Sequence, residues 1–345
     1  MSSATLFSYG FGVATKNASQ EIIEVFYPQP VIAPDADISA ILCKHFNHAD
    51  ASCDTYELDD AGIADLSSAL QGVDQSAAES LAALAGAEQC VVCLLGTDAA
   101  PSSVSEVFLK LHLLSHRLTQ PQTLALDGMF GILKNLAWTN VGPIDLDELP
   151  ARQLEARLNG ETLDVQCVDK FPKMTNYVVP RGVRIADTAR VRLGAYVGEG
   201  TTVMHEGFVN FNAGTLGTAM IEGRISAGVI VGNNSDLGGG CSTMGTLSGG
   251  GKEIISVGEN CLIGANAGIG FPLANGCIVE AGLYVTAGTK VNLLDGERNT
   301  VKTVKAKELM TLENHLYRRN SLNGAVECVP LKSQMSLNEE LHSHN

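Results

Sequence analysis

The sequence predicts a chain of three parts: an α/β domain in the N-terminal half, a parallel β-helix after it, and a short C-terminal segment. Of the 36 glycines, 24 lie between Gly182 and Gly288, although that window is under a third of the 345 residues. Aliphatic residues in the same window recur at every sixth position, which is the period of a solenoid built from hexapeptide units. The first 179 residues instead show helical apolar spacing and a short apolar run typical of a buried strand.

The N-terminal domain, residues 1–179, has three segments that favour helices. Residues 67–84 and 104–118 carry apolar residues at helical spacing, and residues 145–159 begin acid-rich and end before Gly160, a stop signal. The run CVVCLL at residues 90–95 predicts a short buried strand. These elements indicate an α/β domain whose topology the pattern leaves open.

The β-helix is predicted at residues 180–291. Three six-residue units close one triangular coil, with the aliphatic residue of each unit pointing inward and with Gly, Asn and Asp forming the turns. A β-sandwich is the alternative, but its period of two does not place aliphatic residues six apart over many units. The inward positions are Ile185, Val191, Val197, Val203, Val209 and Ile221, then Ile225, Val231 and Leu237, then Val257, Ile263 and Ile269, then Val279, Val285 and Val291.

Two segments interrupt the hexapeptide period. They are residues 244–254 (MGTLSGGGKEI) and residues 271–276 (FPLANG). Insertions in a solenoid commonly form loops on one face, often the binding face, so we expect both to leave the coil. The C-terminal segment, residues 292–345, is polar, with a helix expected at residues 306–319.

Charge and cysteine content restrict the function class and the compartment. The 23 Lys and Arg against 38 Asp and Glu give a net charge of −15 and an isoelectric point near 4.9, the wrong sign for binding nucleic acid or an anionic membrane. Nine cysteines, an odd number in a long chain, predict free thiols in a reducing setting. With neither a basic leader nor an apolar run of membrane length in the sequence, we expect a cytoplasmic protein.

Several motifs receive a structural interpretation. The CxxC formed by Cys90 and Cys93 lies inside an apolar run, which favours packing over redox chemistry. The glycine runs lack the full spacing of a phosphate-binding loop or a dinucleotide fold. His205 is the only histidine of the repeat region, too few nitrogen ligands for a catalytic zinc within one chain.

Two glutamates of the repeat region are candidates for chemistry, because charged residues are scarce around them. Glu206 and Glu222 could each act as a general base, a nucleophile or a metal ligand, or could be solvated turn residues. Arg224 lies two residues after Glu222 and shares its face if the segment is extended. It could pair with that glutamate or hold an anionic group of a substrate.

Positive charge gathers near the C-terminus of this acidic chain. A basic cluster beside the end of a coil could receive the phosphates of a soluble cofactor, and a solvated helix face explains the same charges equally well. Its members are Lys302, Lys305, Lys307, Arg318 and Arg319.

The repeat region and the tail resemble a known family. The strings MIEGRISAGVIVG, SDLGGG, MGTLSGGG, IVEAGLYVTAGTKV and YRRNSLNGAVE are similar to the longer form of the tetrahydrodipicolinate N-succinyltransferases. The similarity is dense at residues 176–291 and resumes at residues 304–327. It implies a left-handed parallel β-helix, a homotrimer, and succinyl transfer from succinyl-CoA to L-2-amino-6-oxopimelate, ring-opened tetrahydrodipicolinate, in diaminopimelate and lysine biosynthesis.

The resemblance also implies roles for individual residues. Glu222, in MIEGR, matches the family's acyl-carrying glutamate, although the same carboxylate could be the base that deprotonates the attacking amine. Glu206, in MHEG, matches a carboxylate that binds magnesium at the trimer axis in some members, but the second acidic ligand falls on Ala189. The residues that would line the succinyl-CoA site are Arg224, Gly239, Ser242, Ala265, Glu280, Ala281, Gly288, Lys305, Arg318, Arg319, Asn320 and Ser321.

Two other functions remain as alternatives. One is an acetyl-CoA-dependent transferase of the same fold that acts on another amine or on a hydroxyl. The other is a trimeric β-helical scaffold without catalysis, which predicts that Glu222→Ala changes no activity. No nucleic-acid or membrane partner is expected.

Overall fold

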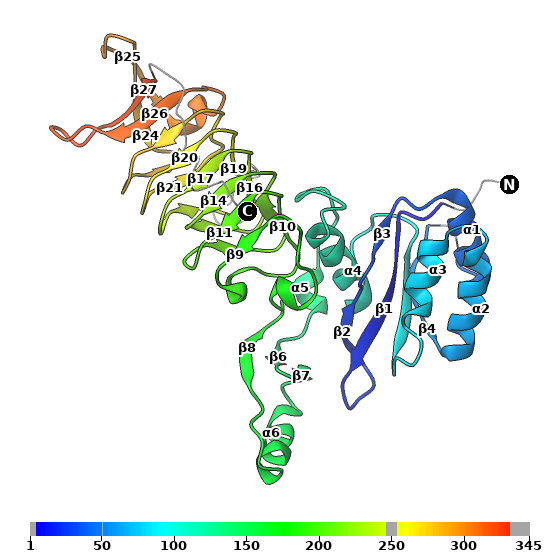
Figure 1. Cartoon of the computed structure of the whole chain (residues 1–345). Helices are drawn as coiled ribbons and strands as arrows, with labels where there is room; N and C mark the ends of the chain where they lie inside the picture. The colour runs from blue at the N-terminus through cyan, green and yellow to red at the C-terminus, as the bar shows by residue number, and fades with distance from the viewer. Residues whose placement is uncertain (1–4, 50, 246–253, 332–345) are drawn as a thin grey trace. The chain divides into compact units, whose positions relative to one another are not determined.

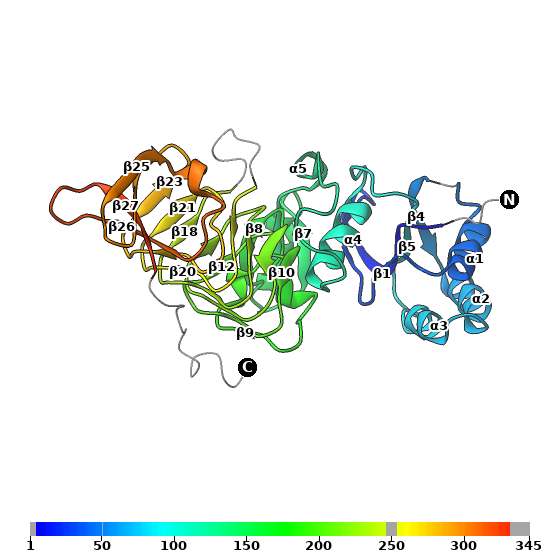
Figure 2. The ribbon, with the colours of Figure 1, turned by 90° about the horizontal axis from the view of Figure 1, so that it is seen from above.

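The computed structural model describes residues 5–49, 51–245 and 254–331. The chain divides into two compact units: residues 1–119, 123–172 and 176–178 form the first, and residues 120–122, 173–175 and 179–345 form the second. Figures 1 and 2 show the helices gathered in the first unit and the stacked short strands in the second. Within the described residues, no helix has the length and apolarity needed to span a membrane.

The first unit is built on an antiparallel sheet with the strand order β2-β1-β5-β4, and β3 also pairs with β1. The centre of this sheet is β5, the apolar run CVVCLL predicted as a buried strand, and all six of its residues are buried. The strands are β1 (Ser8–Lys16), β2 (Ile22–Phe26), β3 (Val31–Ile32), β4 (Cys53–Leu58) and β5 (Cys90–Leu95).

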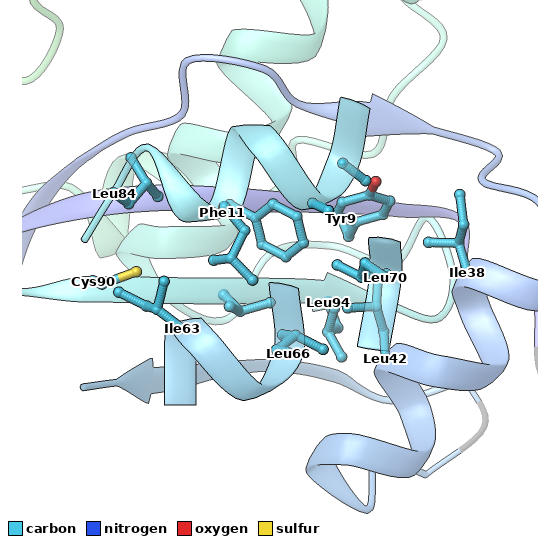
Figure 3. Close-up of a cluster of buried hydrophobic side chains, with 14 of the residues drawn as sticks. Tyr9, Phe11, Ile38, Leu42, Ile63, Leu66, Leu70, Leu84, Cys90 and Leu94 are labelled. Atoms are coloured by element: carbon cyan, nitrogen blue, oxygen red, sulfur yellow. The ribbon is translucent and has the colours of Figure 1, made fainter. Parts of the chain in front are cut away.

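Helices cover both faces of this sheet. The first core joins Tyr9 and Phe11 of β1 to apolar residues of three helices (Figure 3). On the opposite face Gly10 turns toward the fourth helix, since a Cβ there would lie 2.8 Å from Leu109. The helices are α1 (Ala36–Phe46), α2 (Asp60–Gln71) and α3 (Gln75–Ala82) on the first face, and α4 (Val104–Ser115) on the second.

The structure confirms the structural interpretation of the CxxC pair. Cys90 belongs to the core beneath α1–α3, whereas Cys93 lies three residues along an extended strand and so points to the other face. Burial raises the pKa of both thiols, to about 11 for Cys90 and about 12 for Cys93. Neither thiol is therefore poised for redox chemistry.

A smaller antiparallel sheet completes the first unit. Its strand order is β7-β6-β8, and α6 lies between β7 and β8 along the chain. None of the residues of α6 is buried. The elements are α5 (Met129–Ile132), β6 (Leu136–Thr139), β7 (Gly142–Asp145), α6 (Leu149–Leu158) and β8 (Val165–Asp169).

Two predicted helices differ from the structure in extent. The segment 67–84 belongs to two helices, because Gly72 ends α2 and Asp74 caps α3 by accepting a hydrogen bond from the Ala77 amide. The segment 145–159 begins as a strand, since Asp145 pairs with Leu136, and it becomes helical only at Leu149.

The second unit is a left-handed parallel β-helix with three sheets along its length. The first sheet contains β10 (Ala195–Val197), β13 (Ala213–Thr215), β16 (Ile230–Val231) and β19 (Ser256–Val257). The second contains β9 (Arg184–Ile185), β11 (Thr201–Val203), β14 (Ala219–Ile221), β17 (Ser235–Leu237), β20 (Leu262–Ile263) and β22 (Ile278–Val279). The third contains β12 (Phe208–Val209), β15 (Arg224–Ile225), β18 (Ser242–Thr243), β21 (Gly268–Gly270) and β23 (Tyr284–Thr286).

The inward aliphatic positions stack on one another from coil to coil, as predicted. In the second sheet Ile221 pairs with Leu237 and Ile263 pairs with Val279, and all four are fully buried. Each fully buried aliphatic side chain contributes roughly 1.5–3 kcal/mol. Thr215 occupies the inward position between Val209 and Ile221, because it pairs with Val197 and Val231 of the neighbouring coils, and its hydroxyl lies 2.6 Å from that of Thr201.

The corners of the coil use residues that tolerate positive φ. Asn212, Asn234, Asn260 and Asn266 all have φ between 50° and 55°. The step between inward positions is four residues rather than six from Ile221 to Ile225 and from Ile269 to Leu273. At both places one corner is two residues shorter than its neighbours.

The shortened corner at Ile269 corrects the expectation for residues 271–276. These residues were expected to leave the coil as a loop, but Leu273 pairs in parallel with Val257 and is buried in the stack. The break in period is therefore a deletion of two residues and not an insertion. The other expected loop, residues 244–254, falls mostly on residues 246–253, which lie outside the described residues.

The C-terminal segment packs as strands on the second unit, and the helix expected at residues 306–319 is wrong. Only Ala306–Leu309 is helical, as a 3₁₀ turn, and β26 pairs with β22 of the coil and with β27. Backbone pairing with the exposed last coil outweighs the local helical pattern. The strands are β24 (Lys290–Leu294), β25 (Thr300–Lys305), β26 (His315–Arg319) and β27 (Val326–Pro330).

Candidate functional site

The corner between the second and third sheets brings four candidate residues into one column. The backbone bonds run from coil to coil: the Gly240 amide donates to Glu222, the Asn266 amide donates to Gly239, and the Gly282 amide donates to Ala265, at 3.3, 2.9 and 2.8 Å. Glu222, Gly239, Ala265 and Ala281, which are far apart in the sequence, therefore occupy equivalent turns of successive coils.

The small residues of this corner are required by close backbone approach. A Cβ at Gly264 would lie 2.5 Å from the Ala281 amide nitrogen, and one at Gly238 would lie 2.9 Å from the Ala265 amide nitrogen. Gly239 is different, because its only neighbour within 4 Å is the Oε2 atom of Glu222, 3.5 Å from the position of a Cβ. The half-buried Glu222 carboxylate therefore lies over bare backbone.

The outward face of the third sheet continues the site beside this corner. Arg224, Ser242, Gly268 and Tyr284 are in register on successive coils. Arg224 donates from Nη2 to the Ser242 hydroxyl at 2.6 Å, which fixes the guanidinium against the coil while leaving Arg224 exposed. Arg224 and Ser242, both predicted for acyl-donor binding, thus contact each other directly.

Tyr284 is a candidate that the sequence reasoning missed. A Cβ at Gly268 would lie 2.3 Å from the Tyr284 ring, so the ring leans over the glycine on the outer surface. Tyr284 is nevertheless 45% exposed. The sequence did contain a signal for this residue. Tyr284 directly precedes the inward Val285, and successive residues of a strand point to opposite faces, so its aromatic side chain is expected to point outward.

Cys241 lies between the charged candidates but has a packing role. Its Sγ atom would be 2.3 Å from a Cβ at position 223, which explains Gly223 in the sequence IEGR. Burial raises the pKa of the Cys241 thiol to about 12. Cys241 therefore packs this corner beside the Glu222 carboxylate.

The C-terminal hairpin is fastened to the same corner. Glu280 accepts a hydrogen bond from the Arg319 amide at 2.7 Å. Arg318 donates to Glu327 from Nε and Nη2, at 3.0 and 2.8 Å, and Asn320 donates to the other oxygen of Glu327. Glu280, Arg318 and Asn320 thus hold the hairpin in place, and the Arg318 cation is already paired.

Gly288 and Lys305 meet at the next corner. The Ala306 amide donates to Thr289 at 2.9 Å and the Lys307 amide donates to Ala287 at 3.2 Å, so the two segments run side by side. Gly288, Lys305, Arg319 and Ser321 are all exposed. Three of the five cations in the basic cluster, Lys302, Lys305 and Lys307, lie on the strand β25 or the turn after it.

Glu206 lies one coil before Glu222, and its side chain is 72% exposed and hydrogen-bonded to the His205 ring at 2.9 Å. Asp187 is occupied in accepting a hydrogen bond from the Ala189 amide. Across residues 5–49, 51–245 and 254–331, no three His, Cys, Asp or Glu side chains form a metal-binding group. The donor set of one chain, a single exposed carboxylate, does not fit a magnesium site, since Mg²⁺ requires octahedral oxygen coordination.

The fold and the corner define a class of protein: a hexapeptide-repeat β-helix of the transferase type, with a carboxylate beside exposed small-residue backbone. Three family models match the chain. They are the N-terminal and middle models of tetrahydrodipicolinate N-succinyltransferase, at residues 66–131 and 133–173, and the hexapeptide repeat of succinyl-transferase, at residues 254–287.

Curated relatives match along the whole chain. A 2,3,4,5-tetrahydropyridine-2,6-dicarboxylate N-succinyltransferase of Pseudomonas putida is 60% identical over 99% of this chain and 100% of its own length. The protein of the same name from Vibrio cholerae is 56% identical over 98% of this chain and 99% of its own. A solved structure from Campylobacter jejuni, assigned as a 2,3,4,5-tetrahydropyridine-2-carboxylate N-succinyltransferase, superposes with a TM-score of 0.88 at 32% identity, covering 95% of this chain and 93% of that one. The chain belongs to the tetrahydrodipicolinate N-succinyltransferase family.

Proposed function

We propose that this protein transfers the succinyl group of succinyl-CoA to the amino group of L-2-amino-6-oxopimelate, the ring-opened form of tetrahydrodipicolinate, within diaminopimelate and lysine biosynthesis. The observation that carries the proposal is the 60% identity, over 99% of the chain, to a relative named for this reaction. The column of Glu222, Gly239, Ala265 and Ala281 supports it, because exposed backbone at small residues lets an extended pantetheine lie close to the coil.

Glu222 supplies the chemistry in this proposal. Acyl transfer to an amine breaks the thioester C–S bond, forms an amide bond, and moves one proton from the nitrogen toward the departing thiolate. A carboxylate serves this reaction in two ways. It accepts the amine proton while the amine attacks the thioester, or it attacks the thioester first and passes the acyl group on from a mixed anhydride.

The surrounding residues position the acyl donor. Arg224, held by Ser242 at 2.6 Å, is an exposed cation two residues from Glu222 and can pair with the carboxylate of the succinyl group. Lys305 and Arg319 are exposed cations that can meet the phosphates of CoA, with Gly288 and Ser321 beside them. Glu280, Arg318 and Asn320 act by fixing the hairpin that carries Arg319.

The proposed assembly is a cytoplasmic homotrimer. All nine cysteines are free thiols, which agrees with a reducing compartment. The corner of Glu222 is an open surface of one prism, so a neighbouring prism would enclose the substrate. Size-exclusion chromatography with light scattering should give three times the chain mass of 36.3 kDa.

The test is thiol release from succinyl-CoA and from acetyl-CoA, each with and without L-2-aminopimelate as a stable acceptor. We expect release only with succinyl-CoA and the amine together. Glu222→Gln should lower kcat by at least about 100-fold, the usual size of general acid–base catalysis. The matched control is Glu259→Gln, an exposed corner glutamate on another edge of the coil, which should retain full activity.

Each outcome separates one alternative from the proposal. Release only with acetyl-CoA would assign the chain to another acyl transfer, and full activity of Glu222→Gln would remove the role of this carboxylate. Exchange of isotopically labelled CoA into succinyl-CoA in the absence of amine distinguishes the two mechanisms, because a mixed anhydride on Glu222 releases CoA reversibly before the amine binds, whereas direct attack by the amine gives no exchange.

A further inference from the structure

A cavity lies entirely within the N-terminal unit. Its volume is about 560 Å³, within the range of small-molecule sites. One wall comes from β1 and β2, and the other from the hairpin of β6 and β7 together with β8 and the residues before the coil. The lining residues are Val13, Thr15, Glu24, Phe26, Trp138, Thr139, Asn140, Gly142, Pro143, Gln166, Asn176 and Tyr177.

The β1–β2 wall presents one carboxylate at a defined place. Val13 pairs with Phe26 and Thr15 pairs with Glu24 across the two strands, so all four side chains share one face. This face is apolar at the first pair and polar at the second. Glu24 is only 5% exposed, although it borders the cavity.

The charge of Glu24 has no opposite charge beside it. Thr15 donates a hydrogen bond to its Oε2 atom at 2.7 Å, and the hydroxyl of Tyr177 donates another. In the described part of the chain no Lys or Arg pairs with Glu24, and Glu24 is the only ionisable acid or base of these twelve residues besides the Tyr177 phenol. Burial raises the pKa of Glu24, because a buried carboxylate without a cation beside it is costly to ionise, so a cation bound in the cavity would stabilise its charged form.

Aromatic rings form much of the remaining lining. The rings of Phe26 and Tyr177 meet edge to face with centroids 6.0 Å apart. Trp138 is fixed because its indole N–H donates to the Asp169 carbonyl at 2.9 Å. The faces of such rings carry negative potential and attract organic cations.

We propose that this cavity binds a small organic ammonium ion, with the positive charge directed at Glu24 and an apolar body among Phe26, Trp138 and Tyr177. Anionic and zwitterionic compounds are disfavoured, since no basic side chain lines the cavity to receive a carboxylate or phosphate. The amide side chains of Asn140, Gln166 and Asn176 offer hydrogen bonds to a polar substituent. This inference concerns the first unit alone and does not depend on the transferase proposal.

The experiment uses Trp138, the only tryptophan of the chain, as a reporter inside the proposed site. The full-length protein is titrated with n-butylammonium chloride, n-butanol and sodium butyrate at constant ionic strength, and Trp138 emission is recorded. We expect a saturable change with n-butylammonium only. Glu24→Gln should weaken this binding at least tenfold, because the amide keeps the shape and removes the charge.

Controls keep the test decisive. Glu161→Gln, which removes an exposed carboxylate of the same unit, should bind as wild type does. Where circular dichroism shows that Glu24→Gln folds poorly, Glu24→Asp takes its place: it keeps the charge on a shorter side chain and should still bind n-butylammonium in preference to n-butanol, and a folded Glu24→Asp without that preference would count against the proposal. Three results would overturn the proposal. They are a response to n-butanol equal to that of n-butylammonium, an unchanged affinity in a folded Glu24→Gln, and the absence of a saturable response to n-butylammonium. Sodium chloride at the same concentration serves as the control for a general salt effect on Trp138 emission.

Discussion

Truncating one inward residue of the coil should destabilise the β-helix far more than truncating its neighbour. Ile263 is fully buried and stacks between Leu237 and Val279, whereas Leu262, the preceding residue, points outward and is half-buried. Backbone ladders hold the flanking coils at fixed spacing, so the space left by Ile263→Ala cannot collapse. We expect a loss of about 3 kcal/mol in the free energy of unfolding.

Hydrogen exchange followed by mass spectrometry measures this loss where it occurs. Peptides that cover residues 256–270 should exchange through unfolding about 150-fold faster in Ile263→Ala, because each 1.4 kcal/mol is a factor of ten. Leu262→Ala should cost less than about 1 kcal/mol, as expected for a partly exposed site. Equal losses in the two variants, or no measurable loss for Ile263→Ala, would refute the stacking argument.

Two further predictions concern pH. Burial alone would raise the pKa of Glu327, but hydrogen bonds from Asn320 and Arg318 hold it below the usual 4.5, so its contribution is present above pH 4.5 and lost as pH falls through the lowered value. Amides of β26 and β27 should therefore lose exchange protection in acid, and Glu327→Gln should remove this dependence; protection unchanged at low pH would contradict it. Burial lowers the pKa of His112 to about 3 from 6.5, and its ring accepts from the Tyr27 amide and donates to the Phe108 carbonyl as a neutral tautomer. The unfolded chain gains this proton first, so stability of the first unit should fall between pH 6.5 and 3 by about 1.4 kcal/mol per pH unit. Urea unfolding followed by Trp138 emission should show the slope, and His112→Gln should reduce it by one proton; an identical slope in both would be evidence against a neutral His112.

The coil could be predicted from the sequence because its inward positions are simple to recognise. An aliphatic residue in every sixth place has one structural interpretation, and positions such as Val203 and Ile263 are buried as expected. The expectation for residues 271–276 failed because a lost pair of residues and an inserted loop break the period in the same way. Only the pairing of Leu273 with Val257 distinguishes them.

The C-terminal segment and the site geometry depend on contacts that no local pattern contains. Leu309, Leu312 and Leu316 have helical spacing, yet Leu316 pairs with Ile278 of the coil because the last coil presents an open edge. Similarly, the motif IEGR identifies Glu222, but its contact with Gly239 follows from the stacking of two coils. The pairing of Arg318 with Glu327 likewise requires the hairpin to form first.

The four-residue step from Ile221 to Ile225 has a consequence for how such a scaffold acquires a site. The equivalent corners on either side, from Val203 to Val209 and from Leu237 to Thr243, keep six residues, so the corner that carries Glu222 is recessed between two longer ones. The recess results from a shorter turn and not from added loops, so no loop has to be ordered around it. The stack of inward aliphatic residues continues through this coil, because only the turn is shortened. Two residues inserted after Gly223 would fill the recess and leave the stack in register, so the coil would survive while its concavity is erased.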